Sequence, residues 1–275
     1  MFEPSEIFAP GLLEGTVVLV TGGGTGLGRA AALELVRCGA SVVLAGRRQE
    51  VLDAAAERLG GHASTVSGDI RDDADAERIV RAAIAAYGRL DVLVNNAGGQ
   101  YFVPAESIEQ KGFRAVTRLN LAATERMSRL AQTLAFEDQG SGTIVNVTLS
   151  PHHGLTGMVH SSAARAAVEG LTRALACEWP STTVVALAAG HFETEALDKY
   201  PDVVRQHAAR SVPLQRLGRP EEHAWLVPLA ASPLGRHLSG STITLDGARD
   251  NWFGPWPPPA LVVEGEVPTE ERRPR

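Results

Sequence analysis

Residues 17–30 constrain the fold of this chain more than any other stretch. A short run of β-branched and apolar residues, 17–21, enters a cluster of glycines, which opens into an alanine- and leucine-rich segment. This order is typical of a strand, a tight turn and the first turn of a helix. Glycines permit positive φ and let a ligand approach the backbone closely. Because a helix N-terminus presents unpaired N–H groups and a positive dipole end, the turn is suited to bind a phosphate.

The rest of the chain alternates between predicted strands and predicted helices. The strands are expected at 41–45, 63–67, 90–94, 143–148, 182–187 and 241–245. The helices are expected at 30–38, 50–59, from Asp72 or Asp73 to 87, within 113–137, and from Ser161 or Ser162 to the residue before Pro180. Such alternation predicts a parallel sheet covered on both faces, whose ligands bind beyond the carboxyl ends of the strands. We therefore predict an α/β protein with a single doubly wound Rossmann domain and a seven-stranded parallel sheet.

The predicted domain spans residues 15–250, after an N-terminal extension at 1–14 and before a Pro- and aromatic-rich tail at 251–275. With 275 residues, of which 44% are hydrophobic, the chain is long enough to bury one full core. Charges of both signs are interspersed around a net charge of −6, which argues against a nucleic-acid partner.

Targeting signals and membrane segments are not apparent in the sequence. No apolar run approaches the roughly 18 residues of a membrane span, and the acidic N-terminus is unlike a signal peptide. The final Arg-Arg-Pro-Arg differs from the Ser-Lys-Leu peroxisomal address. Cys38 and Cys177 lie in helical patterns and suggest no disulfide framework, and no His or Cys spacing indicates a metal site. A cytoplasmic location is therefore predicted.

A second motif, Asn95-Asn96-Ala97-Gly98, follows the fourth predicted strand. Together with Thr21-Gly22-x-x-x-Gly26-x-Gly28, it resembles the short-chain dehydrogenase/reductase family over residues 15–247. The resemblance implies a nicotinamide cofactor, with Asp69 at the adenine and Thr194 at the nicotinamide carboxamide. The cofactor residues that it implies are Thr21, Gly22, Gly24, Thr25, Gly26, Leu27, Gly28, Arg47, Arg48, Asp69, Ile70, Asn96, Ala97, Gly98, Arg165, Gly190 and Thr194.

The end of the second strand bears on the choice of cofactor. A carboxylate there would bind a ribose 2′-hydroxyl and repel a 2′-phosphate, but the chain has Arg47 and Arg48 instead. Because a guanidinium can pair with phosphate through two hydrogen bonds, the sequence favours NADP(H). The alternative is that both arginines are ordinary solvated residues at a helix start, and Asp69 similarly is either an adenine contact or a helix cap.

The family's catalytic pattern is only partly present. The resemblance places Ser161 where the family usually has its acid/base Tyr, and Arg165 where the family has a Lys four residues later. The position of the family's Ser is Thr148 or Ser150, and Asn120 matches the Asn of its proton relay. Arg165 can hold a ribose and supply charge, but it does not titrate near neutrality. The three tyrosines of the chain, Tyr87, Tyr101 and Tyr200, are all out of register.

In several positions where the sequence departs from the usual family pattern, it resembles one branch of the family, the peroxisomal trans-2-enoyl-CoA reductases. Shared segments include Gly98-Gly99-Gln100 and the stretch from Val159 to Ala166. In enoyl thioester reduction, hydride adds at C3 and the thioester oxygen becomes negative, so hydrogen-bond donors matter most. Thr148, Ser161 or Gln100 could donate. His160 is a candidate proton donor because imidazole titrates near neutrality, although a His at a helix start is also a common cap or packing residue. The catalytic candidates are Asn120, Thr148, Ser161, Arg165 and His160.

The leading hypothesis is an NADP(H)-dependent reductase that lacks the Tyr/Lys pair and acts on an enoyl or keto thioester or a related carbonyl compound. One alternative keeps the fold but is a lyase, dehydratase or isomerase. Another is a non-catalytic subunit that retains cofactor binding. The resemblance also implies a homodimer or homotetramer, built through the helices around 113–137 and 161–179, in which alanines permit close approach.

Overall fold

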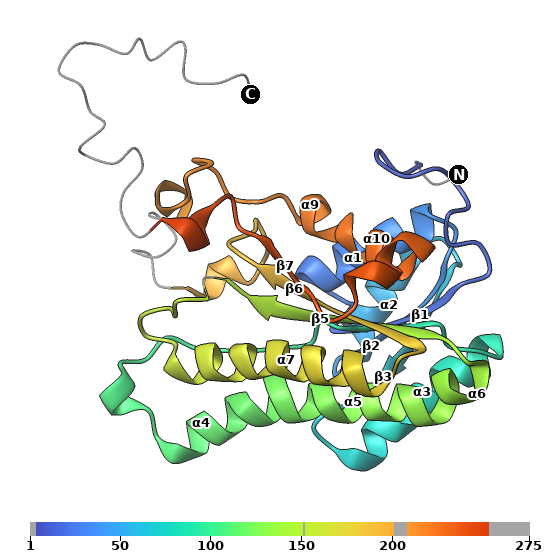
Figure 1. The fold of residues 1–275 in the computed structure, drawn as a ribbon, viewed down its shortest axis with the longest axis horizontal. Coiled ribbons are helices and arrows are strands. Elements are labelled where there is room, and N and C mark those ends of the chain that lie inside the picture. The colour runs from blue at the N-terminus through green and yellow to red at the C-terminus, as the bar shows by residue number, and fades with distance from the viewer. Residues whose placement is uncertain (1–3, 151, 201–207, 253–275) are drawn as a thin grey trace, which may run out of the picture.

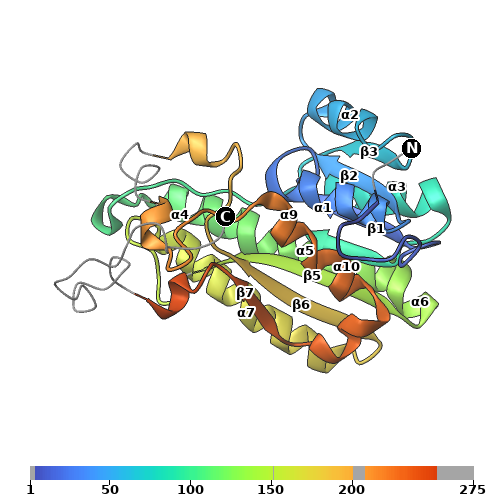
Figure 2. The same ribbon diagram turned by 90° about the horizontal axis from the view of Figure 1, so that it is seen from above.

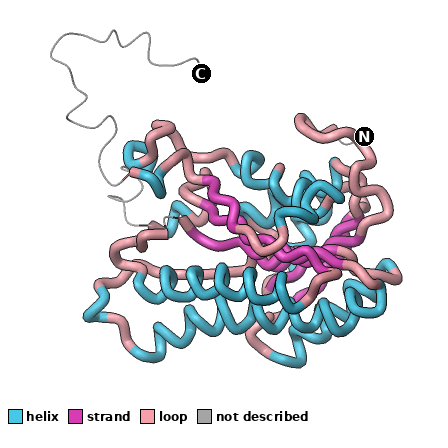
Figure 3. Tube along the Cα trace, in the orientation of Figure 1, coloured by secondary structure: helices cyan, strands magenta, loops and turns pink. Residues whose placement is uncertain are grey.

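The structure, a computed structural model, describes residues 4–150, 152–200 and 208–252. A parallel sheet crosses the middle of the molecule between two layers of helices (Figures 1 and 3). Its strand order is β3-β2-β1-β4-β5-β6-β7, which confirms the predicted seven-stranded doubly wound fold. The strands are β1 (Val17–Thr21), β2 (Ser41–Gly46), β3 (Ala63–Ser67), β4 (Val92–Asn95), β5 (Gly142–Leu149), β6 (Thr182–Ala189) and β7 (Thr242–Leu245).

The helices divide between the two faces of the sheet. One face carries α1 (Gly26–Arg37), α2 (Gln49–Glu57), α9 (Pro220–Ala224) and α10 (Leu226–Ala231). The other carries α3 (Asp73–Tyr87), α7 (Val159–Glu178) and one long rod (Figure 1). The rod joins α4 (Gln110–Thr117), α5 (Ala123–Ala131) and α6 (Glu137–Gln139) through the π-helical turns η2 (Arg118–Ala122) and η3 (Gln132–Phe136). Short 3₁₀ turns are η1 (Ala105–Ser107), η4 (Leu197–Lys199), η5 (Ala209–Ser211), η6 (Pro233–Leu238) and η7 (Arg249–Asn251).

Successive side chains of each strand point to opposite faces of the sheet, so the strands contribute to a hydrophobic core on each face. Val18 and Val20 of β1 pack under α1, whereas Val17 and Leu19 face the α3 and α5 side. All five residues of β1 are buried, as expected for a central strand of a parallel sheet. Two cores of comparable size therefore fix the sheet between the helical layers.

Several predicted boundaries differ from the structure, and three of them bear on the site or the sheet. The helix after the glycine turn begins at Gly26 rather than 30, so residues 26–29, which were predicted as part of the turn, form its first turn. The helix predicted from Ser161 or Ser162 begins at Val159, preceded by Met158 rather than by a capping side chain. β4 begins at Val92 rather than 90, and the Asp91 side chain just before it accepts a hydrogen bond from the Val17 N–H at 2.9 Å at the start of β1.

The predicted terminal segments are only partly described. Leu13 of the N-terminal extension is buried in the core, and its N–H donates to the Cys38 carbonyl at 2.8 Å. Of the tail predicted at 251–275, residues after Trp252 lie outside the described part of the chain. Within the described ranges, no helix has both the length and the apolar composition that a bilayer crossing requires.

The topology creates one favoured place for a ligand. β1 and β4 are neighbours, yet the chain leaves β1 toward one face and β4 toward the other. The turns that follow them therefore part and leave a crevice at the carboxyl ends of the strands. Figure 2 shows the sheet from above, with α1 and α9 on the near face. The glycine turn and the Asn95–Gly98 segment meet at this switch point.

Candidate active site

A cleft of about 900 Å³ lies at the carboxyl ends of the strands. Its volume is typical of a pocket for a cofactor and a small substrate. Of the predicted cofactor residues, those lining it are Gly22, Gly24, Thr25, Gly26, Leu27, Arg47, Arg48, Asp69, Ile70, Asn96, Ala97, Gly98, Arg165, Gly190 and Thr194. Thr21 and Gly28 do not line the cleft.

Thr21 and Gly28 lie behind the cleft and fix the position of the residues that line it. The Thr21 hydroxyl accepts hydrogen bonds from the N–H groups of Asn96 and Ala97, each at 3.1 Å. A Cβ atom at Gly28 would lie 2.4 Å from the Asn96 amide nitrogen and 2.4 Å from the Gly22 carbonyl oxygen. Only glycine therefore lets α1 pack so closely on the turn, and Gly22 itself has a φ of +66°.

The N-terminus of α1 already holds a negative group. Glu195, from the loop after β6, accepts a hydrogen bond from the Gly26 N–H at 3.2 Å and pairs with Arg29 at 2.6 Å. A carboxylate therefore occupies the position where the helix dipole and unpaired N–H groups favour an anion. Because this position accepts a carboxylate, the turn is also suited to the diphosphate of a dinucleotide.

Positive charge gathers where β2 and β3 end. Arg47 and Arg48 are exposed on the cleft. Arg71 also lines it, and its guanidinium makes paired hydrogen bonds to the Asp69 carboxylate at 2.5–3.0 Å. These bonds, helped by the charge of Arg47, lower the pKa of Asp69 to about 2. Arg71 was not among the predicted cofactor residues, although it follows Asp69 by only two positions.

Asn120 and Arg165 meet at Gly98 and Gly99. Asn120 lies in the π-helical turn η2, is fully buried, and bonds to both backbone groups of Gly99: its Oδ1 accepts from N–H at 3.0 Å and its Nδ2 donates to the carbonyl at 2.8 Å. Arg165 donates to the Val147 carbonyl at 2.7 Å. A Cβ atom at Gly98 would lie 2.2 Å from the Arg165 guanidinium. Burial lowers the pKa of Arg165 to about 10, so the guanidinium stays cationic at neutral pH.

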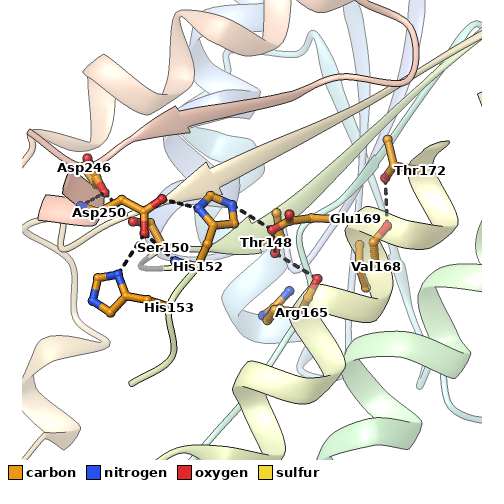
Figure 4. A network of polar contacts seen from close by, with 10 residues as sticks. All are labelled: Thr148, Ser150, His152, His153, Arg165, Val168, Glu169, Thr172, Asp246 and Asp250. Carbon is orange, nitrogen blue, oxygen red and sulfur yellow. Dashed lines mark hydrogen bonds and ion pairs between the residues drawn. The ribbon is translucent and has the colours of Figure 1, made fainter. Parts of the chain in front are cut away.

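Thr148 lines the cleft from the end of β5 and begins a polar network that reaches the surface (Figure 4). Its hydroxyl lies 3.3 Å from both the Arg165 carbonyl oxygen and a Glu169 carboxylate oxygen, and it can donate a hydrogen bond to either of them. Glu169 contacts His152 Nε2 at 3.0 Å, and His152 Nδ1 contacts Asp250 at 2.5 Å.

The outer end of this network ties the last described segment to the sheet. The Asp250 N–H donates to Asp246 at 2.8 Å, and Asp246 also accepts from the Ser150 hydroxyl. Burial acts to lower the pKa of His152, but the Asp250 and Glu169 carboxylates outweigh it and raise that pKa overall. The alternative serine position, Ser150, is therefore engaged with Asp246, while Thr148 is the residue that faces the cleft.

His160 and Ser161 lie on the inner face of α7 and are fully buried, and neither lines the cleft. The His160 ring packs edge-on against Tyr101, with ring centroids 4.5 Å apart. The Ser161 hydroxyl donates to the Gln100 side-chain oxygen at 3.5 Å. The structure thus does not bring these two predicted catalytic residues to the cleft surface. His191 does line the cleft, and burial, with the charge of Arg249, lowers its pKa to about 4.

Gln100 and Tyr200 line the cleft beside Arg165. Gln100 Nε2 donates to the Tyr200 hydroxyl oxygen at 2.9 Å, and the Tyr200 ring packs edge-on against Phe102 at 4.9 Å between centroids. Sequence reasoning did not find Tyr200 as a site residue because it lies in the loop after β6, far from the helix where a tyrosine was sought.

Comparison with known proteins gives a match to a family model and to named relatives. The model of the short chain dehydrogenase family matches residues 16–203. A Bacillus subtilis probable 2,4-dienoyl-CoA reductase, named as (2E)-enoyl-CoA-producing, is 35% identical over 89% of this chain and 100% of its own. An Arabidopsis thaliana peroxisomal 2,4-dienoyl-CoA reductase, named as (3E)-enoyl-CoA-producing, is 32% identical over 87% of this chain and 86% of its own.

A solved structure agrees in fold. The citronellol catabolism dehydrogenase of Pseudomonas aeruginosa superposes with a TM-score of 0.80 at 38% identity, covering 89% of this chain and 98% of its own. The matches bear out the predicted family and its link to reductases of unsaturated acyl-CoA. The names of these curated relatives specify 2,4-dienoyl-CoA, whereas the branch identified from sequence motifs was that of the trans-2-enoyl-CoA reductases.

Proposed function

This chain belongs to the short-chain dehydrogenase family, and from that premise we propose that it is an NADP(H)-dependent reductase of an unsaturated acyl thioester. One observation carries the proposal: a single cleft joins a dinucleotide-binding turn to a cationic pocket formed by Arg165, Thr148 and Gln100. The names of the curated relatives supply the substrate class.

Different residues of the cleft would contact different parts of the cofactor. The Gly22–Leu27 turn would hold the diphosphate, and Arg47 and Arg48 would pair with a 2′-phosphate. Asp69 would face the adenine, and Arg165 and Thr194 would lie toward the ribose and nicotinamide. When bound, the reduced nicotinamide supplies hydride to the far end of the conjugated double bond.

The protein must then stabilise the charge that reaches the thioester oxygen. Arg165 provides a fixed positive charge, because its guanidinium is held by the Val147 carbonyl and stays protonated. On the same cleft wall, Gln100 keeps a second amide hydrogen to donate, and the Thr148 hydroxyl can turn its proton from the Arg165 carbonyl or Glu169 to the thioester oxygen. Preorganised donors of this kind stabilise an enolate without solvent reorganisation. We propose that Asn120 acts by fixing the Gly98–Gly99 turn, through its paired bonds to Gly99.

A 2,4-dienoyl thioester suits this site as well as a 2-enoyl one. Hydride addition to C5 of a dienoyl thioester, or to C3 of an enoyl thioester, places the same negative charge on the thioester oxygen. The carbon that is protonated decides the product: C4 gives a 2-enoyl and C2 gives a 3-enoyl thioester from the diene. The proposal therefore covers both double-bond arrangements.

The test is consumption of NADPH, followed by its absorbance, with 2-enoyl-CoA, 2,4-dienoyl-CoA and 3-ketoacyl-CoA of matched chain length. The saturated acyl-CoA is the control, and citronellol with NADP⁺ tests the activity named for the structural relative. We expect turnover with an enoyl or dienoyl thioester and none with the saturated one. NADPH binding without any consumption would contradict the proposal. Product formation without cofactor would instead favour a lyase, dehydratase or isomerase.

A further inference from the structure

Tyr200 brings a phenol into the cleft from outside the helix that carries Arg165. Tyr200 follows η4 in the loop after β6, whereas Arg165 lies in α7. Both side chains line the cleft. The position in α7 where the family has its tyrosine is Ser161 here, and that residue is buried beneath Gln100.

A short hydrogen-bonded chain connects these residues. The Ser161 hydroxyl donates to Gln100 Oε1 at 3.5 Å, and Gln100 Nε2 donates to the Tyr200 oxygen at 2.9 Å. The bond from Ser161 orients the Gln100 amide so that its NH₂ faces Tyr200. Because Tyr200 accepts this bond through its oxygen, its own O–H proton remains available to a substrate in the cleft.

Arg165 and Phe102 complete the environment of the phenol. The Arg165 guanidinium and Tyr200 line the same cleft, and the Tyr200 oxygen acts to raise the pKa of Arg165 against the larger effect of burial. A nearby guanidinium stabilises the negative oxygen that remains after the phenol gives up its proton. The edge-on contact with Phe102 limits the motion of the ring and holds the hydroxyl on the cleft wall.

We propose that Tyr200 is the proton donor of the reduction and that Gln100 positions it. The proposal rests on the proposed reductase function. After hydride addition, the enolate electron pair forms a C–H bond with the Tyr200 hydroxyl proton, and the C=O of the thioester re-forms. The O–H bond of Tyr200 breaks, its electron pair stays on the phenolate beside Arg165, and solvent returns one proton. The sum is one hydride and one proton added across the substrate.

Tyr200→Phe tests the assignment, because it removes only the hydroxyl and keeps the ring against Phe102. We expect kcat to fall about 100-fold or more, with little change in the thioester KM, since general acid catalysis typically contributes that much. The Kd for NADPH, measured by fluorescence, should stay within about twofold because the phenol belongs to the substrate end. Tyr87→Phe, at the end of α3 and outside the cleft, is the matched control.

A second readout follows the proton itself. With wild-type protein in D₂O, we expect deuterium to enter one face of the protonated carbon, because a fixed donor delivers it. With Tyr200→Phe, solvent should deliver deuterium to both faces. Gln100→Met should also lower kcat, and the double variant with Tyr200→Phe should lose less than the two single losses multiplied, because part of the effect of Gln100 passes through the phenol.

The outcomes separate this inference from the proposed function. A wild-type protein that consumes no NADPH with any thioester refutes the reductase function, and Tyr200 then has no such role. An active wild type with an equally active and equally stereoselective Tyr200→Phe variant refutes only the assignment of Tyr200. A loss of selectivity in Tyr101→Phe instead would transfer the role to the other tyrosine that lines the cleft.

Discussion

The carboxylate of Glu195 lies at the N-terminus of α1, where it accepts a hydrogen bond from the Gly26 N–H at 3.2 Å and contacts Arg29 at 2.6 Å. Gly26 and Glu195 are 169 positions apart in the chain. Their contact links the loop after β6 to the turn that would hold a diphosphate. We therefore expect cofactor binding to be coupled to the position of this loop, since the Glu195 carboxylate and a cofactor diphosphate would compete for one helix terminus.

Replacing Glu195 should strengthen cofactor binding. In Glu195→Gln the competing charge is gone and Arg29 becomes available to a phosphate. Because charges at a helix N-terminus contribute about 0.3–1 kcal/mol, we expect the Kd for NADPH to fall about two- to fivefold in a fluorescence titration. Glu193→Gln is the matched control, since Glu193 lies two residues earlier. Unchanged or weaker binding by Glu195→Gln would show that the carboxylate does not compete.

Arg47 should decide between the two nicotinamide cofactors. Arg47→Ala removes a guanidinium that can pair with a 2′-phosphate, so NADPH binding should weaken about tenfold or more while NADH binding changes little. Both Kd values are measured by fluorescence on the same preparation. Arg58→Ala, an exposed arginine at the end of α2 that does not line the cleft, is the control. Equal losses for NADPH and NADH would refute 2′-phosphate recognition by Arg47.

Gly98 should tolerate no side chain. The Cβ of Gly98→Ala would lie 2.2 Å from the Arg165 guanidinium and 2.9 Å from Asn120 Oδ1, and Arg165 is anchored to Val147. We expect overpacking to cost about 1–3 kcal/mol in the free energy of unfolding, measured with urea, and activity to be lost as Arg165 moves. Gly170→Ala in α7 is the control, because its nearest neighbour would be 4.0 Å away. That change should be neutral or stabilising by up to about 1 kcal/mol.

His152 should make stability depend on pH. The folded protein raises its pKa through Asp250 and Glu169, while His153 also faces Asp250. The stabilisation is therefore complete below the unfolded pKa of about 6.5 and is lost as pH rises through the folded pKa. The pKa of Asp250 is lowered, so that partner stays ionised down to acidic pH.

The measurement compares urea unfolding of wild type and His152→Gln at about pH 5.5 and about pH 8.5. The variant should be the less stable protein, and the difference should be larger at the lower pH. His237→Gln, an exposed histidine in η6, should show no such dependence. A difference that grows toward alkaline pH would contradict a cationic His152 between two carboxylates.

The proposed homodimer or homotetramer should depend on α7. Ala163, Ala166 and Ala167 are exposed on this helix, beside α4, and small side chains permit close helix approach. Ala167→Arg should therefore shift the wild-type dimer or tetramer toward monomer in size-exclusion chromatography with light scattering. Ala54→Arg places the same side chain on exposed α2, at the opposite face of the sheet, and should leave the mass unchanged. A monomeric wild type would refute the assembly.

The sequence by itself determined the fold and where its ligand cleft lies. The strand, glycine turn and helix of residues 17–37 are contiguous, and so are β4 and the Asn95–Gly98 segment. Because these motifs are local, their spacing alone indicated a doubly wound sheet with a ligand at its switch point, and the residues expected there, except Thr21 and Gly28, line one cleft.

Only the tertiary structure decided which side chains reach the reacting end of the cleft. Gln100 and Tyr200 are 100 positions apart, and His152 and Asp250 are 98 apart. No periodicity or short motif records such pairs, because they meet only when the sheet brings the loops after β4, β5, β6 and β7 to one edge. The same packing turned His160 and Ser161 inward on α7. A helix pattern predicts which residues share a face, but its neighbours decide which face is buried.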